Sequence, residues 1–313
     1  MIVDAHHHLW RIDQGYSWLN ATEVEPIRHT FSPAELRAEL TAHGVDRTVL
    51  VEGGRCDGDE ARLLFGYLAE TPEIAGVVAW ADPCSPDLDE TLLGYRALPG
   101  GERLVGIREQ IQGVDDPGYL DRDDLRRGLS TIGAQGLAFD LVIRADQIAA
   151  AARLAGELPA VRFVLDHLGK PAIRTGRFRS WAADLALLAA CPNVTAKLSG
   201  LVTEASWDSW TVDDLRPYVE EALRLFGADR LMFGSDWPVC TLAPASRNDA
   251  GPERGDASRA AAGNAEHENA ERGNASASAY GKWFAALEVI LPADAREAVL
   301  GGTAAQTYHL SLD

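Results

Sequence analysis

The chain of 313 residues has only four cysteines and no long apolar run. The cysteines lie far apart and form no Cys-x-x-Cys pair, so neither a thiolate zinc site nor a disulfide framework is expected, in keeping with a reducing compartment. No stretch approaches the roughly 20 consecutive apolar residues that span a bilayer, and the N-terminus lacks a basic region and a cleavage site. These absences predict a cytoplasmic protein without a membrane partner.

Positive charge is scarce as well. The chain has 29 Lys and Arg residues against 47 Asp and Glu, a net charge of −18, and it contains no basic run. The electrostatic potential of so negative a protein repels nucleic acid and anionic membranes, so we expect neither as a partner. An anionic substrate would need a locally positive pocket. Only three of the basic residues are lysines, namely Lys170, Lys197 and Lys282, and each is therefore worth locating.

Short runs rich in β-branched residues alternate with helical patterns along the chain. The helix expected over residues 32–44 has Ser32 as its N-cap, Glu35 to close a capping box and Gly44 as its stop. Eight strands separated by helices predict a single (β/α)8 TIM barrel over residues 1–313, with an open doubly wound sheet as the alternative. The strands are expected near residues 2–5, 47–52, 75–80, 104–108, 137–143, 161–166, 193–199 and 230–235.

One segment interrupts this alternation after the eighth strand. Residues 247–279 contain no Ile, Leu, Val, Met, Phe, Tyr, Trp or Cys. Such a stretch buries too little apolar surface to offset the entropy of ordering it. It is expected to be a disordered, low-complexity insertion in the loop after strand 8, with an active-site lid as the alternative.

The first strand runs directly into three histidines, in the sequence MIVDAHHHLW. Side chains alternate between the two faces of a strand, so Asp4, His6 and His8 are expected on one face and His7 on the other. Two imidazoles on one face can converge on a metal ion or on an activated water. A chance cluster of histidines in a surface turn is the alternative.

Polar residues also end the other strands, where a barrel places its catalytic groups. The alternation of Thr195, Lys197 and Ser199 with apolar neighbours predicts that Lys197 points into the barrel. Each residue has an ordinary alternative role, such as a turn cap for Asp140 or Asp166, a structural ion pair for Glu52 with Arg108, or a solvated cation for Lys170. The convergence of four side chains at strand ends nevertheless favours one shared site, made of His6, His8, His167 and Asp236.

Five segments, read with their order along the chain, resemble the amidohydrolase superfamily. They are DAHHHLW, FVLDHLGKP, KLSGLVTEA, RLMFGSDWPVC and LGGTAAQTYHL, and the likeness covers nearly the whole chain except residues 247–279. The likeness is greatest to the amidohydrolase-related branch of TIM-barrel hydrolases that contains sugar-acid lactonases. It implies an enzyme that acts on a small lactone, such as L-fucono-, L-rhamnono- or L-galactono-lactone.

The resemblance also implies roles for the residues at the strand ends. Asp236 would be the general base toward water, with its pKa raised by desolvation. His6, His8 and His167 would either bind a divalent metal together with Asp236, zinc foremost, or act without metal by hydrogen bonds to the carbonyl and the water. The tetrahedral oxyanion would be stabilised by Lys197 and Arg108, and His167 belongs to the catalytic group as well as to the ligands.

Substrate contacts are expected from Glu52, Glu109, Asp140 and Trp237. Glu52 stands where this branch commonly has Gln, and Glu109 stands where a His is common. Both changes would add a carboxylate to the rim of the site and disfavour an anionic substrate. Trp10, Trp18 and Trp80 are further candidates for an aromatic floor under a sugar ring, with core packing as the alternative for each tryptophan.

Other functions remain open on these residues. A metal-dependent decarboxylase or an amide hydrolase of the same superfamily would use the same ligands, whereas a binding barrel would have no reason to retain a base. No organic cofactor is expected, and a homodimer is compatible with the sequence.

Overall fold

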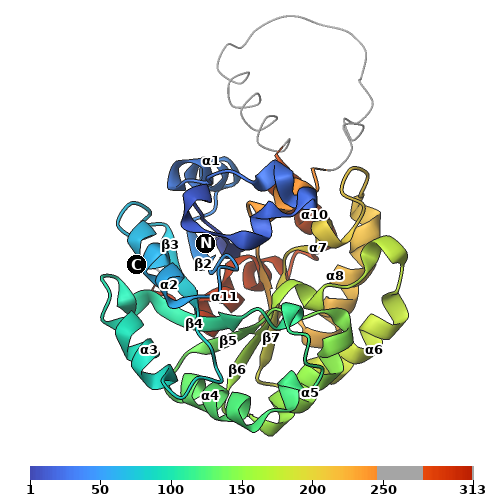
Figure 1. Ribbon diagram of the computed structural model, residues 1–313. Coiled ribbons are helices and arrows are strands. Elements are labelled where there is room, and N and C mark those ends of the chain that lie inside the picture. Colours follow the sequence, from blue (N-terminus) through green and yellow to red (C-terminus); the bar gives the residue numbers. More distant parts are fainter. Residues whose placement is uncertain (245–277, 312–313) are drawn as a thin grey trace, which may run out of the picture.

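The computed structural model describes residues 1–244 and 278–311, and within them eight parallel strands pair in sequence order (Figure 1). The amide of Asp236 donates a hydrogen bond to the His6 carbonyl (2.8 Å), and that of His8 donates to the Trp237 carbonyl (2.7 Å). These bonds join the last strand to the first, so the fold is the predicted (β/α)8 TIM barrel. The strands are β1 (Val3–His7), β2 (Arg47–Val51), β3 (Ile74–Trp80), β4 (Leu104–Glu109), β5 (Ala138–Leu141), β6 (Arg162–Leu165), β7 (Val194–Leu198) and β8 (Leu231–Phe233).

Helices surround the barrel, and the first of them has the predicted ends (Figure 1). The Ser32 hydroxyl accepts from the Glu35 amide, the Glu35 carboxylate accepts from the Ser32 amide, and Gly44 ends the helix in the left-handed conformation. The helices are α1 (Pro33–His43), α2 (Gly58–Tyr67), α3 (Leu88–Arg96), α4 (Asp123–Ala134), α5 (Ile148–Glu157), α6 (Phe178–Ala189), α7 (Leu201–Glu204), α8 (Val212–Phe226), α10 (Ala279–Ile290) and α11 (Thr303–Tyr308).

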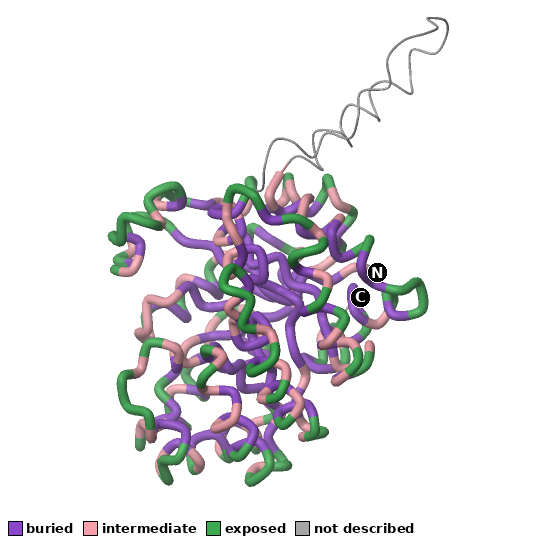
Figure 2. Tube along the Cα trace, turned by 90° about the vertical axis from the view of Figure 1, so that its right-hand side faces the viewer, coloured by how far each residue is buried: buried purple, intermediate pink, exposed green. Residues whose placement is uncertain are grey.

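The apolar core has two layers, and Figure 2 shows the buried residues gathered in the middle of the molecule. The larger layer fills the space between the strands and the helices. The smaller layer fills the barrel itself with Val3, Val49, Val78 and Met232, among others, and α11 contributes Tyr308 to it. Above this apolar filling the interior of the barrel becomes polar, and the site is built there.

Strand β1 departs from the alternation expected at its end. Its pairing with β2 shifts between Asp4 and His7, where three steps along β1 match two along β2, which marks a β-bulge. Asp4 therefore faces outward, where it accepts a hydrogen bond from Tyr280 of α10, and does not share the face of His6 and His8. The prediction for Asp4 was wrong because one extra residue reverses the facing of everything that follows it.

The expected insertion, residues 247–279, lies outside the described residues except for its last two. Within residues 1–244 and 278–311, no helix is both long enough and apolar enough to cross a membrane.

The packing of α4 against the loop after β3 gives a test of the fold. A Cβ atom added at Gly128 of α4 would lie 1.7 Å from the Pro83 carbonyl oxygen, whereas one added at Gly94 of α3 would meet nothing within 4 Å. Alanine normally stabilises a helix by about 1 kcal/mol relative to glycine. We expect Gly94→Ala to raise the melting temperature and Gly128→Ala to lower stability by about 1–3 kcal/mol through overpacking. Calorimetry on both variants checks this, and a Gly128→Ala protein as stable as Gly94→Ala would contradict the packing.

Candidate active site

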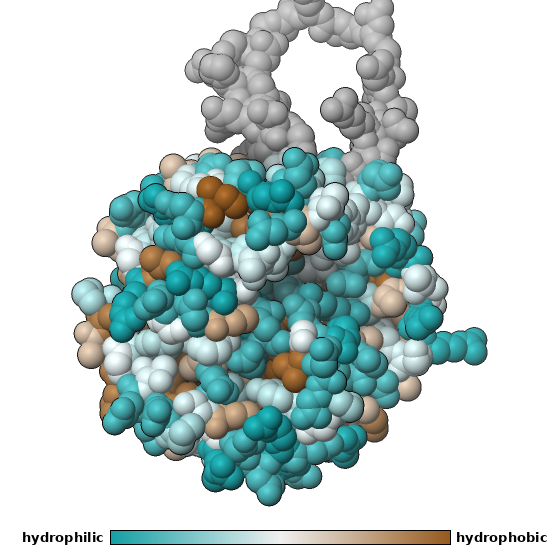
Figure 3. All heavy atoms as spheres, in the orientation of Figure 1, coloured by the Kyte–Doolittle hydropathy of each residue, from teal (hydrophilic) through white to brown (hydrophobic). Residues whose placement is uncertain are grey.

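A cavity of about 380 Å³ opens at the ends of the strands, and Figure 3 shows this face as largely hydrophilic around a central hollow. Its volume is in the range of small-molecule sites. It lies at the carboxyl ends of the strands, where TIM barrels carry their active sites. Its wall is formed by His8, Trp18, Gly53, Gly54, Cys56, Arg108, Gln110, Gln112, Val142, His167, Lys170, Thr203, Asp236 and Val239.

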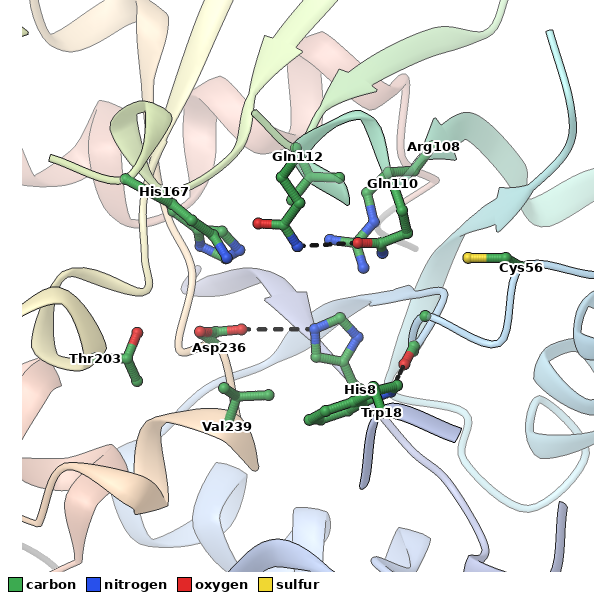
Figure 4. A pocket seen from close by; sticks show the side chains of 14 residues that line it. His8, Trp18, Cys56, Arg108, Gln110, Gln112, His167, Thr203, Asp236 and Val239 are labelled. Atoms are coloured by element: carbon green, nitrogen blue, oxygen red, sulfur yellow. Dashed lines mark hydrogen bonds and ion pairs between the residues drawn. The ribbon is translucent and has the colours of Figure 1, made fainter. Parts of the chain in front are cut away.

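Four of the predicted side chains converge: His8, His167 and Asp236 line the cavity (Figure 4), and His6, which is fully buried, lies against them. Ligand atoms of His6, His167 and Asp236 all lie within 4.8 Å of one another, and all three residues are buried. His8 Nε2 lies 3.2 Å from His6 Nε2 and 3.5 Å from Asp236 Oδ1. Histidine and carboxylate ligands sit about 2.0–2.2 Å from zinc, so such donor separations suit a single ion at the centre.

Hydrogen bonds at the outer nitrogens orient two of these imidazoles. His8 Nδ1 lies 2.9 Å from the Val51 carbonyl, which can only accept, so Nδ1 of His8 carries a proton and Nε2 is turned toward His6 and Asp236. His167 Nδ1 lies 2.9 Å from the Ser199 hydroxyl. Burial lowers the pKa of His167 to about 4, so this imidazole is neutral near pH 7. Neutral, oriented imidazoles are the form that binds a metal ion, so the donor set fits one.

Asp236 differs from expectation in its ionisation. Burial alone would raise the pKa of its carboxyl, but neighbouring His167 and His8 hold the pKa below its ordinary value. Asp236 is therefore ionised at neutral pH and able to accept a proton. The expected upward shift was wrong because the imidazoles around the carboxylate outweigh its desolvation.

A network of buried charges lies directly beneath the histidines. Lys197 Nζ is 2.6 Å from Asp140 Oδ2, 2.9 Å from Asp166 Oδ1 and 3.1 Å from His6 Nδ1. Arg108 donates to Asp166 Oδ2 (2.9 Å) and pairs with the Glu52 carboxylate. Each of these side chains is at most 4% exposed. The network fixes His6 from below, because both Lys197 and Asp166 contact its Nδ1.

Lys197 points into the barrel as predicted but does not line the cavity. Its ammonium is fully buried among carboxylates, so the expected contact with an oxyanion finds no support in its position. Arg108 does line the cavity, with its guanidinium held by two carboxylates.

None of the four expected substrate contacts is among the residues that line the cavity. Glu52 is fully buried on Arg108 and is not at the rim, because the guanidinium draws its carboxylate inward. Asp140 is occupied by Lys197 and by the Tyr308 hydroxyl (2.7 Å). Glu109 accepts from the Gln110 amide, and burial raises its pKa to about 7. Trp237 is 3% exposed in the apolar core.

The cavity is lined instead by residues that were not expected to contact the substrate, or that were only secondary candidates. Trp18, one of the four tryptophans considered, lines it with its indole N–H held by the Gly53 carbonyl (2.7 Å). Lys170 also lines it, and its ammonium forms no hydrogen bond or ion pair with any described residue. Asp166, treated only as a candidate cap, is central to the charge network. Gln110 and Gln112 also line the cavity and were not predicted, since no strand or helix periodicity marks the turn that carries them.

Known proteins match this chain along most of its length. Residues 3–310 match the sequence profile of a family described as amidohydrolase. The chain is 35% identical over 243 residues to a protein of Burkholderia ambifaria named L-fucono-1,5-lactonase, covering 77% of this chain and 81% of that one. A protein of the same name from Burkholderia multivorans is 35% identical over 253 residues, with 77% and 83% covered. An amidohydrolase of Burkholderia multivorans, crystallised with bound zinc, has a TM-score of 0.79 at 31% identity, covering 99% of this chain and 100% of that one.

The buried network predicts that Lys197 is needed for stability. Removing its charge in Lys197→Met leaves Asp140 and Asp166 buried without their shared cation. Breaking a buried pair in this way costs about 3–5 kcal/mol. We expect urea unfolding to show that loss, while Lys282→Met, at the third and half-buried lysine, changes stability little. Equal unfolding midpoints for the two variants would show that the network contributes nothing.

A second buried carboxyl predicts a dependence of stability on pH. Glu60 of α2 accepts from the Gly53 amide (2.6 Å), and burial beside the charge of Glu52 raises its pKa to about 8 from 4.5. The folded state therefore binds this proton more tightly than the unfolded chain does, so its contribution to stability is complete below about pH 4.5 and is lost as the pH rises to about 8.

We expect Glu60→Gln to remove much of this dependence. The fall in melting temperature between pH 5.5 and pH 8.5 should be smaller in Glu60→Gln than in the unaltered protein. Glu288→Gln, at an exposed position of α10, serves as the control and should retain the full fall. An unchanged fall in Glu60→Gln would contradict the raised pKa.

Proposed function

The chain belongs to the amidohydrolase family, and we propose that its cavity hydrolyses a small sugar-acid lactone to the open acid. The observation that carries this proposal is the position of an ionised carboxylate, Asp236, among three histidines at the floor of the cavity. The L-fucono-1,5-lactonases at 35% identity support the substrate class. L-fucono-, L-rhamnono- and L-galactono-lactone are the first candidates.

In this reaction Asp236 takes a proton from a water molecule as the water attacks the lactone carbonyl. The lowered pKa of Asp236 keeps it in the basic form at neutral pH. The backbone bonds of Asp236 to His6 and of Cys240 to Asp236, both 2.8 Å, hold the base on the barrel rim. A fixed base needs no reorganisation when the proton moves.

Positive charge for the developing oxyanion comes from two cavity residues, one of which, Arg108, belongs to the buried network. Arg108 lines the floor, and its planar guanidinium is held in place by Glu52 and Asp166. Lys170 brings an ammonium that carries no ion pair among the described residues to the same cavity. Fixed charges aimed at the carbonyl oxygen stabilise the transition state more than the neutral substrate.

The donor set also supports a divalent ion, zinc above all. His6, His167 and Asp236 would hold it, with His8 Nε2 adjacent. A bound ion of this kind polarises a carbonyl oxygen and lowers the pKa of its water. The proton acceptor and the orientation of the imidazoles are provided by the chain itself.

A pH-indicator assay on L- and D-aldonolactones, run with and without a chelator, tests the function. We expect release of one acid per lactone by the unaltered protein and a fall of about 10²–10⁴-fold in kcat for Asp236→Asn, the usual contribution of a general base. A loss of activity on chelation that added zinc restores would show that the reaction needs the divalent ion for which His6, His167 and Asp236 are the candidate ligands.

Asp229→Asn provides the matched control, since Asp229 is exposed and precedes β8 at the opposite end of the barrel. It should retain full activity. If no lactone of the panel is hydrolysed even after zinc is added, lactone hydrolysis is refuted. A test for CO2 release from carboxylated substrates would come next.

A further inference from the structure

Two glutamines connect the buried charge network to the open cavity. Gln110 Nε2 donates to Glu52 Oε1 (2.6 Å), and Gln112 Nε2 donates to Gln110 Oε1 (3.0 Å). Glu52 itself is fully buried and is held by Arg108. Both glutamines line the cavity, and Figure 4 shows them side by side on one wall.

The direction of this chain of hydrogen bonds is fixed at its buried end. A carboxylate paired with a guanidinium only accepts, so Gln110 must turn its NH₂ group toward Glu52 and its carbonyl oxygen toward Gln112. Gln112 must then donate to that oxygen. Its own carbonyl oxygen is left facing the cavity, on the side where His167 and Asp236 lie (Figure 4).

The backbone of Gln112 is held as well. Its amide donates to the Val142 carbonyl (2.9 Å), and its carbonyl accepts from Arg144. A flip of either side-chain amide would set two donors or two acceptors against each other, which would cost a partly buried hydrogen bond. The side-chain oxygen of Gln112 is therefore a hydrogen-bond acceptor that is held in one position in the cavity, near His167 and Asp236.

We propose that Gln112 determines specificity by accepting a hydrogen bond from one hydroxyl group of the lactone ring. This inference rests on the proposed function, which it extends to the substrate feature that is recognised. A site built to bond a hydroxyl discriminates against an analogue that lacks it, because the protein acceptor then loses its partner. A substrate carboxylate at the same place meets an oxygen lone pair, so Gln112 also selects against anionic lactones.

Singly deoxygenated lactones test the inference. For the aldonolactone that the unaltered enzyme opens fastest, kcat/KM is measured together with each analogue that lacks one ring hydroxyl. We expect one analogue to be penalised about tenfold, the effect of losing one neutral hydrogen bond. In Gln112→Leu the penalty for that analogue should shrink to less than about threefold. Gln306→Leu, an exposed glutamine on α11, should leave the penalty unchanged.

The outcomes separate the two proposals. A penalty that persists in Gln112→Leu, or the lack of any penalised analogue in the unaltered enzyme, overturns the role of Gln112 while lactone hydrolysis stands. An unaltered enzyme that opens no lactone overturns the proposed function and this inference with it. If Gln112→Leu does not fold, Gln110→Leu decides in its place, because releasing the Gln112 amide must also reduce the penalty.

Discussion

The pairing of two cations with three carboxylates inside the barrel is the interaction on which the site depends. Lys197 and Arg108 neutralise Asp140, Asp166 and Glu52, and each of these side chains is at most 4% exposed. Buried charges are stable only when they are paired and hydrogen-bonded, so the geometry of this layer is tightly constrained. His6 lies on it, and the other imidazoles and Asp236 converge on His6.

The site thus has two layers. The buried charges keep the catalytic side chains in place, and the polar residues that line the cavity face the substrate. Glu52 connects the two, because the same carboxylate that pairs with Arg108 also orients Gln110. Arg108 and Gln110 both donate to Glu52 Oε1, and the Gly54 amide donates to Oε2 (2.6 Å). A glutamine at position 52 would turn its NH₂ group against one of these donors, whereas the carboxylate accepts at both ends. The carboxylate at position 52 therefore sets the direction of the hydrogen bonds that Gln110 and Gln112 make on the cavity wall. It does so although Glu52 is itself fully buried.

The sequence predicts the barrel and the inward direction of Lys197 because both follow from simple periodicities. It fails where one local irregularity or one unseen partner decides the outcome. The bulge in β1 moves Asp4 to the outer face, and no composition rule marks a bulge. The partners of Lys197 were not predicted, because the two carboxylates that contact it come from β5 and the end of β6, and contacts between strands distant in sequence are set by register.

Charge also gives the proposed reaction a direction. A lactone is neutral, so it enters a protein of net charge −18 without electrostatic cost, and it reaches an ionised Asp236 with no repulsion. Ring opening creates a carboxylate beside that same Asp236. Two like charges in one cavity disfavour retention of the product, with Lys170 as the one cavity ammonium that no described residue neutralises. The net negative charge of the protein therefore also favours release of an anionic product.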